Sequence, residues 1–241
     1  MGAVDVKCLT FAYDGGEEVL RDISFSVSRG EVFVIAGLSG CGKTTLCRIL
    51  CGIIPNMVKG SLIGEITVDG IEPAVAGLPQ TALRVGMVFQ DADSQIICTT
   101  VEDELAFGLE NICRPPEEIR RRVDELMSEF GFEGDRQANP SRLSGGRKKL
   151  LTIAAVLAPS PPILILDEPM SGLDGEGREL VRAALEEQRR QGRTVIIVEH
   201  DLKLVTFADK WLILHDGGVA ATGAPADLMK DGRLLGKLGL L

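Results

Sequence analysis

The chain has 241 residues, of which 45% are hydrophobic and 25% charged, the composition of an ordinary globular protein that can bury a large core. Its formal net charge of −9 argues against nucleic acid as a partner, because a broad nucleic-acid surface needs an excess of lysine and arginine. No apolar run reaches the ~18 residues of a membrane span, and the first residues lack the features of a signal peptide. We therefore expect a protein in the cytosol or bound to a membrane from its cytosolic side.

The N-terminal third predicts strands around one helix. Residues 3–36 have strand patterns with turn signals at 14–16 and 29–30. A helix is expected over 43–52, and residues 61–90 return to strands.

The segment between the first strands and the first helix matches the phosphate-binding pattern G-x-x-x-x-G-K-[ST], and it follows the buried-strand run 32–36 as this motif requires. Its glycines let successive backbone N–H groups face one concavity, where they and the positive end of the helix hold phosphate oxygens. Lys43 adds a charge at the β- and γ-phosphates, and the Thr44 hydroxyl is suited to Mg²⁺. The predicted nucleotide-binding residues are Gly37, Ser39, Gly40, Cys41, Gly42, Lys43, Thr44 and Thr45.

The middle of the chain predicts three helices. Thr100 begins a capping-box pattern whose helix continues to about residue 112, and a second helix is expected over 117–130. Ser144 has the position of an N-cap for a third helix that ends near residue 158. These helices are expected to be inserted into an α/β core.

Strands and a helix alternate again in the C-terminal third. The continuously apolar runs 163–166 and 194–198 have the pattern of parallel strands covered on both faces. A helix is expected over 177–191, and a further strand near an edge over 211–214.

Polar residues follow two of these apolar strands directly. Asp167 and Glu168 follow the first, and His200 follows the second. Because ligands of open α/β sheets bind at the carboxyl ends of strands, these side chains are expected near the phosphate loop. Asp167 is suited to hold Mg²⁺ through its water shell, Glu168 to act as general base on the attacking water, and His200 to reach a γ-phosphate. For His215 the sequence offers only a structural role.

With these residues in place, the chain resembles the nucleotide-binding domain of ABC (ATP-binding cassette) proteins along nearly its whole length. Gln90 stands at the Q-loop position, His200 at the switch-histidine position, and Tyr13 matches the aromatic residue that stacks on adenine. The segment that resembles the family signature LSGGQ is Leu143, Ser144, Gly145, Gly146 and Arg147, and the segment that resembles the D-loop is Ser171, Gly172, Leu173 and Asp174.

The resemblance implies an α/β fold: a P-loop NTPase (RecA-like) parallel sheet core with an N-terminal antiparallel β subdomain and an inserted α-helical subdomain. We accordingly expect one ATP-binding domain over 1–241. Its core and β subdomain would occupy 3–90 and 159–217, its helical subdomain 91–158, and a short C-terminal tail 218–241.

The resemblance also implies ATP and Mg²⁺ as cofactors, and a head-to-tail pair of subunits. Ser144 and the N–H groups that follow it lie at a helix N-terminus, a natural anion site. In this family that site faces the γ-phosphate held by the other protomer, so two subunits close around two ATP molecules. The implied catalytic residues are Glu168, His200 and Gln90, and the implied Mg²⁺ ligands are Thr44, Gln90 and Asp167.

Two positions leave alternatives open. Arg147 stands where the signature usually has glutamine, so it either adds a cation near the partner's phosphates or points into solvent. Cys41 is interpreted, like the other five cysteines, as a reduced thiol. The alternative is a thiol that is sensitive to oxidation, because the nearby helix N-terminus can lower its pKa.

Residues 88–111 resemble the ATPase subunits of energy-coupling factor (ECF) transporters, which take up vitamins or transition-metal ions. Gln95 and the run V-E-D-x-x-A-F-G-L-E-N at 101–111 follow that family, whereas Ala92 replaces its usual proline. The alternative for Gln95 is an exposed loop residue. The resemblance implies three partners: a second ATPase subunit (identical or paralogous), a transmembrane coupling subunit and a substrate-binding membrane subunit. It also implies a peripheral location at the cytoplasmic side of the cell membrane.

Other classes agree less well with the sequence. The ATPase of an ordinary ABC importer or exporter is disfavoured by residues 90–111. A soluble cassette of DNA repair or translation usually has a coiled-coil insertion, a second cassette or a basic surface, and this sequence has none of them. A P-loop kinase or GTPase has no use for residues 143–146, and no N-K-x-D motif is present.

Overall fold

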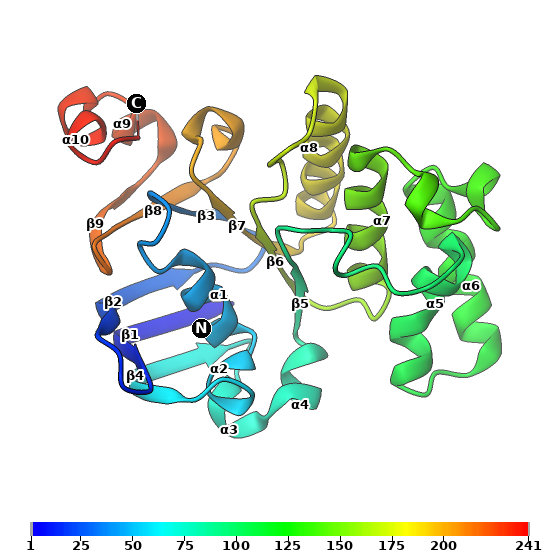
Figure 1. Cartoon of the computed structure of the whole chain (residues 1–241), viewed down its shortest axis with the longest axis horizontal. Helices are drawn as coiled ribbons and strands as arrows, with labels where there is room; N and C mark the ends of the chain where they lie inside the picture. The colour runs from blue at the N-terminus through cyan, green and yellow to red at the C-terminus, as the bar shows by residue number, and fades with distance from the viewer. Residues whose placement is uncertain (1, 241) are drawn as a thin grey trace.

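The computed structural model describes residues 2–240, coloured along the chain in Figure 1. The strands are β1 (Val4–Tyr13), β2 (Glu18–Val27), β3 (Val32–Ala36), β4 (Gly60–Val68), β5 (Val85–Val88), β6 (Ile163–Asp167), β7 (Thr194–Glu199), β8 (Lys210–His215) and β9 (Gly218–Gly223). The helices are α1 (Lys43–Leu50), α2 (Ile53–Asn56), α3 (Pro73–Ala76), α4 (Leu78–Ala82), α5 (Val101–Asn111), α6 (Pro116–Glu129), α7 (Gly145–Leu157), α8 (Gly175–Arg190), α9 (Pro225–Leu228) and α10 (Gly232–Lys237).

A six-stranded sheet in the order β5-β6-β7-β3-β8-β9 forms the centre of the fold. Its first five strands are parallel, and β9 pairs antiparallel with β8 at the edge. Alternate residues of β3 point to opposite faces, so that Val34 belongs to one hydrophobic cluster and Phe33 and Ile35 to another. Burial on both faces is the reason these strands are continuously apolar in sequence.

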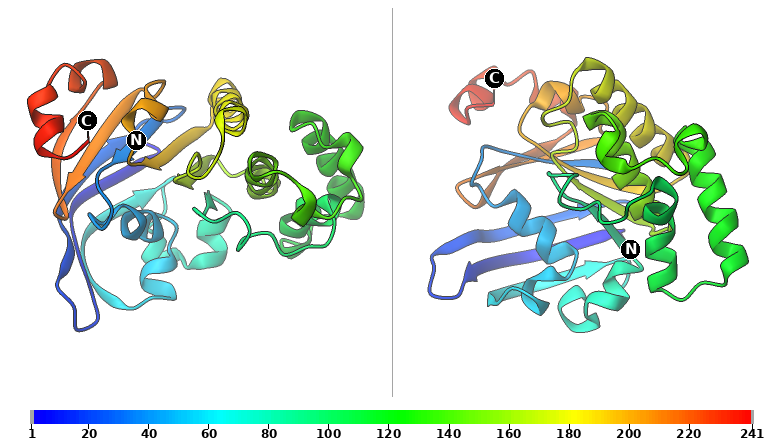
Figure 2. Two further views of the ribbon diagram at one scale, coloured as in Figure 1. Left: turned by 45° about the horizontal axis from the view of Figure 1, so that its top comes forward. Right: turned by 45° about the vertical axis from the view of Figure 1, so that its right-hand side comes forward.

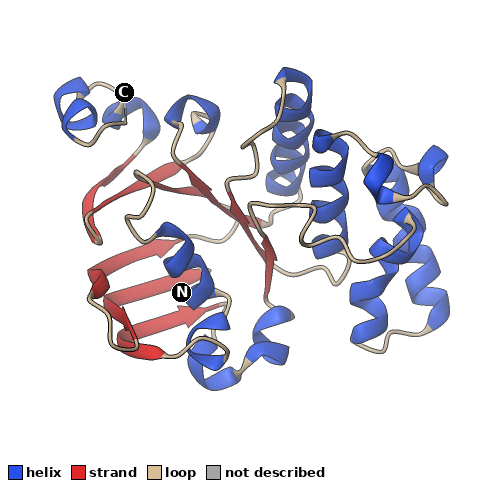
Figure 3. Cartoon of the chain, in the orientation of Figure 1, coloured by secondary structure: helices blue, strands red, loops and turns tan. Residues whose placement is uncertain are grey.

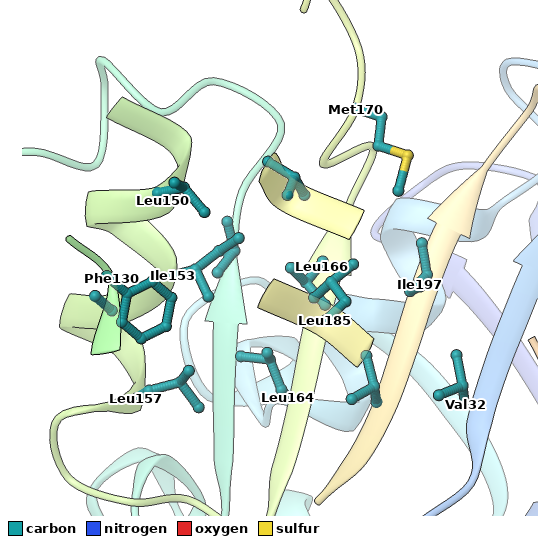
Figure 4. Close-up of a cluster of buried hydrophobic side chains, with 14 of the residues drawn as sticks. Val32, Phe130, Leu150, Ile153, Leu157, Leu164, Leu166, Met170, Leu185 and Ile197 are labelled. Carbon is teal, nitrogen blue, oxygen red and sulfur yellow. The ribbon is translucent and has the colours of Figure 1, made fainter. Parts of the chain in front are cut away.

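Helices α7 and α8 cover one face of the sheet. Figure 4 shows Leu150, Ile153 and Leu157 of α7 in one hydrophobic cluster with Leu164 of β6 and Leu185 of α8. All five side chains are at least 95% buried. A fully buried side chain of this size contributes about 1.5–3 kcal/mol of burial free energy, so this cluster holds α7 and α8 against the strands.

The opposite face is covered by α1 and by a three-stranded antiparallel sheet in the order β2-β1-β4 (Figure 3). Leu46, Ile49 and Leu50 of α1 are buried in the second cluster together with Phe11 and Leu20 of that sheet. The loop between β3 and α1 is therefore fixed at both ends by buried elements.

Helices α5 and α6 lie at the opposite end of the molecule from β9 and α10 (Figure 2). They pack on one another, and α5 packs on α7 beyond the β5 edge of the sheet. Among the described residues, no helix combines the length and the apolar character that crossing a membrane requires.

The predicted α/β class, with a parallel core, an N-terminal antiparallel sheet and an inserted group of helices, is confirmed. Three details differ. Residues 61–90 contain α3 and α4 as well as strands. Helix α8 begins at Gly175 instead of 177, because the Asp174 carboxylate caps it by accepting from Gly177 N at 2.7 Å. Strand β9 joins the sheet, so the boundary expected at residue 217 falls within the β8–β9 hairpin.

Candidate functional site

The loop between β3 and α1 is the predicted phosphate loop, and its glycines are required by close approach. Gly42 is the N-cap of α1 with φ +101°, and a Cβ there would lie 2.6 Å from Leu20 Cδ2. A Cβ at Gly37 would lie 2.4 Å from the Leu214 carbonyl oxygen. A larger residue at Gly37 would push the loop away from the end of β8, and any other residue at Gly42 would be strained by its positive φ.

Lys43 and Thr44 begin α1 and are held at the bottom of this loop. The buried Lys43 ammonium donates to the carbonyl oxygens of Gly37 at 2.8 Å and Leu38 at 2.9 Å. The Thr44 hydroxyl donates to Asp167 Oδ2 at 2.8 Å, from the end of β6. Burial raises the pKa of the Asp167 carboxyl, because desolvation disfavours its charged form. Hydroxyl and carboxylate oxygens are the ligands that a hard divalent cation prefers.

Glu168 follows Asp167 and has an unusual backbone. Its φ of +46° is left-handed, a conformation that costs a non-glycine residue energy and that clusters at functional sites. Its N–H donates to the Val198 carbonyl at 3.0 Å, which ties it to β7. Glu168 Oε2 accepts from Gln90 Nε2 at 2.8 Å, and Oε1 lies 3.4 Å from His200 Nδ1. Gln90, Glu168 and His200 thus converge from the ends of three strands.

Glu199 lies next to this group and was not recognised from the sequence. It is fully buried at the end of β7, and burial raises the pKa of its carboxyl. Its Oε2 accepts from His200 N at 3.1 Å and lies 3.7 Å from His200 Nδ1. Among the described residues, its Oε1 has no hydrogen-bond partner. His200 Nδ1 is therefore situated between two carboxyl groups.

These residues surround two adjoining cavities that share Val19, Ser39 and Gly40. The first, of about 330 Å³, is lined by Val19, Ser39, Gly40, Gly42, Lys43, Thr44, Thr45, Gln90, Glu168 and His200. The second, of about 660 Å³, is lined by Tyr13, Gly16, Glu17, Glu18, Val19, Arg21, Leu38, Ser39, Gly40, Cys41, His215, Asp216 and Gly217.

The second cavity contains residues that the sequence reasoning missed or described differently. His215, expected to be only structural, lines it. The Tyr13 hydroxyl lies 2.9 Å from Thr45 Oγ1, which fixes the ring at the edge of the phosphate loop. Cys41 is 8% exposed, and burial raises the pKa of its thiol although Lys43 opposes the shift. Of the two alternatives for Cys41, the thiol with a lowered pKa is therefore not supported, because desolvation outweighs the effect of Lys43.

The signature-like segment lies elsewhere, at the N-terminus of α7. Ser144 caps the helix, with its hydroxyl accepting from Arg147 N at 3.4 Å. A Cβ at Gly146 would lie 2.7 Å from Gly177 Cα, so glycine at both positions allows α7 and α8 to touch. Leu173, in the D-loop-like segment, lies beside Gly145. No residue of the two segments 143–147 and 171–174 lines either cavity.

Arg147 does not simply point into solvent, because its guanidinium is bound within the subunit. Its Nη2 donates to Asp135 Oδ2 at 2.6 Å and to the Gly131 carbonyl at 2.8 Å. Its guanidinium lies 4.6 Å from the centre of the Phe132 ring. Arg147 therefore holds the N-terminus of α7 to the segment after α6, instead of extending away from the subunit.

The Gln95 side chain forms two hydrogen bonds to the backbone around the end of β5. Gln95 Oε1 accepts from Phe89 N at 3.0 Å, and its Nε2 donates to the Met87 carbonyl at 2.9 Å. Gln95 is thus bound to the backbone that leads to Gln90, and the alternative of a free loop residue is wrong. It also lines a groove of about 300 Å³ between β5, α5 and α7, in which Ile97 and Phe107 are 60% and 39% exposed.

Comparisons with known proteins agree with this geometry. A family model described as ABC transporter matches residues 20–171. A solved structure of cbiO1 from Clostridium perfringens, described as part of the ABC transporter complex cbiONQ, superposes with a TM-score of 0.87 at 34% identity and covers 99% of this chain and 95% of that one.

Curated relatives extend the similarity. The chain is 40% identical over 240 residues to the energy-coupling factor transporter ATP-binding protein EcfA1 of Streptococcus thermophilus, covering 98% of this chain and 85% of that protein. It is 37% identical to EcfA of Methanocaldococcus jannaschii, covering 100% and 85%. It is also 37% identical to a putative ABC transporter ATP-binding protein of Methanosarcina mazei, of which it spans only 41%. The chain therefore belongs to the ATP-binding proteins of the ABC transporter family.

Proposed function

We propose that the chain is the ATP-binding and ATP-hydrolysing subunit of an energy-coupling factor transporter, in which ATP drives head-to-tail closure of two such subunits and thereby powers substrate uptake. The observation that carries the proposal is the convergence of Gln90, Glu168 and His200 beside the phosphate loop. The relatives named as energy-coupling factor proteins support this class of transporter.

The residues of the first cavity divide the chemistry among them. The backbone N–H groups of the phosphate loop and the Lys43 ammonium bind the β- and γ-phosphates. Tyr13, in the adjoining second cavity, stacks on adenine. Glu168 accepts the proton of the water that attacks the γ-phosphate. Gln90 and His200 hold that carboxylate from its two sides, 2.8 and 3.4 Å away, so that it needs little reorganisation when the proton moves.

Mg²⁺ fits the same end of the cavity. Its ligands would be the Thr44 hydroxyl, the Gln90 amide oxygen and, through water, the Asp167 carboxylate. When bound, the ion neutralises charge on the β- and γ-phosphates. The 2.8 Å contact between Thr44 and Asp167 supports this assignment, because it holds two hard oxygen donors side by side.

The separation of the signature from the cavities supports a second ATPase subunit. Ser144 and the N–H groups of Gly145 and Gly146 begin α7 without lining the nucleotide cavity of their own chain. A second subunit, turned head to tail, brings its own signature and its 171–174 segment to this γ-phosphate. ATP then binds the closed pair more tightly than the open pair and shifts the population toward closure.

The groove beside Gln95 supports a membrane partner. Its exposed Ile97 and Phe107 side chains fit an apolar helix of a transmembrane coupling subunit, and Gln95 joins the groove to Gln90 through the backbone. A separate membrane subunit would bind the substrate, a vitamin or transition-metal ion in this class. The chain would then lie at the cytoplasmic side of the cell membrane, with residues 91–158 as the helical subdomain and residues 3–90 with 159–223, which include β9, as the core.

The substitution Glu168→Gln tests this function. Removing the general base should lower the ATPase rate by a factor of about 10²–10⁴ while leaving ATP binding intact, so that an ATP-bound dimer accumulates on size-exclusion chromatography. Glu186→Gln, a change of the same type on the exposed part of α8, serves as control. Hydrolysis by the Glu168 variant at the wild-type rate would exclude Glu168 as the base. Co-purification from native membranes with soluble partners alone would exclude the transporter.

A further inference from the structure

A buried lysine joins α7 to the loop that contains Gln90. Lys149 is 3% exposed, and its Nζ donates to the Phe89 carbonyl at 3.0 Å and to the Gln90 carbonyl at 2.7 Å. Both contacts have ordinary hydrogen-bond lengths. Lysine is almost never fully buried unless its ammonium is paired, and here two main-chain carbonyls supply the acceptors. Lys149 lines neither of the two cavities around the phosphate loop.

Gln90 is consequently held at both of its ends. Its carbonyl accepts from Lys149, and its side-chain Nε2 donates to Glu168 Oε2 at 2.8 Å. The neighbouring Lys148 makes a second, more exposed tie to the same loop, from its Nζ to Asp93 Oδ1 at 2.6 Å. A displacement of α7 therefore pulls directly on the residue that orients the catalytic carboxylate.

The same helix begins with the signature. Ser144 caps α7, and Lys149 lies in its second turn. An α-helix of this length moves as a rigid element, because each backbone N–H is bonded to the carbonyl four residues before it. A change in the position of Ser144 is thus transmitted to Lys149 with little loss.

We infer that Lys149 is a positioning residue that couples the two nucleotide sites of the closed pair. The inference rests on the proposed function, in which Ser144 engages the ATP of the partner subunit. Engagement at the signature sets the position of α7. Helix α7 then sets the position of the Gln90 backbone through Lys149, and the Gln90 side chain sets the orientation of the Glu168 carboxylate in the subunit's own site. Because such coupling is reciprocal for binding, ATP in this subunit's own site also biases its signature toward the partner.

Two substitutions separate hydrogen bonding from charge and packing. Lys149→Met keeps the unbranched apolar stem and removes all donors, leaving the Phe89 and Gln90 carbonyls unpaired. Lys149→Gln removes the same charge but keeps an NH₂ group with two donors. Lys230→Met, which removes a surface lysine paired with Asp227, controls for the loss of one positive charge.

The assay measures ATPase rate against ATP concentration for the full chain, purified with whatever subunits accompany it. We expect Lys149→Met to lower kcat by about 10- to 100-fold, the effect of a misplaced catalytic group, with KM for ATP within about twofold of the wild type. Lys149→Gln should recover most of kcat, and Lys230→Met should match the wild type. A kcat for Lys149→Met within about twofold of the wild type overturns the inference. So does a fall in melting temperature with unchanged kcat.

Hydrogen exchange of residues 89–93 tests the link to α7 directly. In the Glu168→Gln background, ATP should slow exchange in this loop and at residues 144–149 together. With Lys149→Met added, ATP should still slow exchange at 144–147 but no longer at 89–93. Equal protection of the loop in both backgrounds overturns the inference. Absence of ATP hydrolysis by the wild-type chain would instead refute the proposed function, so the two failures are distinct.

Discussion

Replacing Gly146 with alanine should force α7 and α8 apart at the point where the signature meets the D-loop. The added Cβ would lie 2.7 Å from Gly177 Cα, a distance that real Cβ contacts essentially never show. The obstructing atom is main chain, so no side-chain rotation relieves the contact. Overpacking of this kind typically costs about 1–3 kcal/mol of unfolding free energy.

This loss of unfolding free energy can be measured as a fall in melting temperature. A loss of about 1–3 kcal/mol corresponds to a fall in melting temperature of about 2–12 °C for a domain of this length. Because the relief of the clash moves the N-terminus of α7, the ATPase rate should fall more than the stability alone explains. Thermal unfolding by circular dichroism and ATPase assays well below the melting temperature measure the two effects separately.

Gly232→Ala provides the matched control. Gly232 is the first residue of α10, and a Cβ there would have no neighbour within 4 Å. Alanine in a helix is more favourable than glycine by about 0.5–1 kcal/mol, so this variant should be as stable as the wild type or slightly more stable. If Gly146→Ala and Gly232→Ala melted at the same temperature, the tight contact between α7 and α8 would not exist.

Two further predictions concern charged groups near the site. Arg147→Gln should lower the unfolding free energy by about 1.5–3 kcal/mol, because it removes charge-assisted hydrogen bonds within the subunit. The KM for ATP should not change. A large rise in KM would mean that Arg147 faces nucleotide. Glu199 has a pKa raised by burial, so its neutral form favours the folded state. Its stabilising effect is complete below the ordinary value of 4.5 and is lost as pH rises through the raised folded-state pKa. Chemical denaturation from pH 4 to 8 should therefore show that the unfolding free energy of Glu199→Gln increases relative to that of the wild type as pH rises. Parallel profiles of unfolding free energy against pH would contradict this.

The sequence by itself determined the parts of the site that are contiguous. Residues 37–44 specify a phosphate loop because its function depends on consecutive backbone N–H groups, and these are set by local glycines. The acidic pair at 167–168 and the histidine at 200 could be placed at strand ends, because continuous apolar runs mark buried parallel strands. The resemblance to ABC proteins then predicted roles for Gln90 and for the signature.

The tertiary structure alone decided which distant side chains meet. Gln90 and Glu168 are separated by 78 residues, and their contact depends on the pairing of β5 with β6. Arg147 and Lys149 follow one another closely in sequence, yet one turns toward Asp135 and the other toward the loop after β5. Their directions depend on the helical phase of α7 against two different neighbours, which no local pattern specifies. Burial, likewise a property of the whole fold, decided that the pKa of the Cys41 thiol is raised and not lowered.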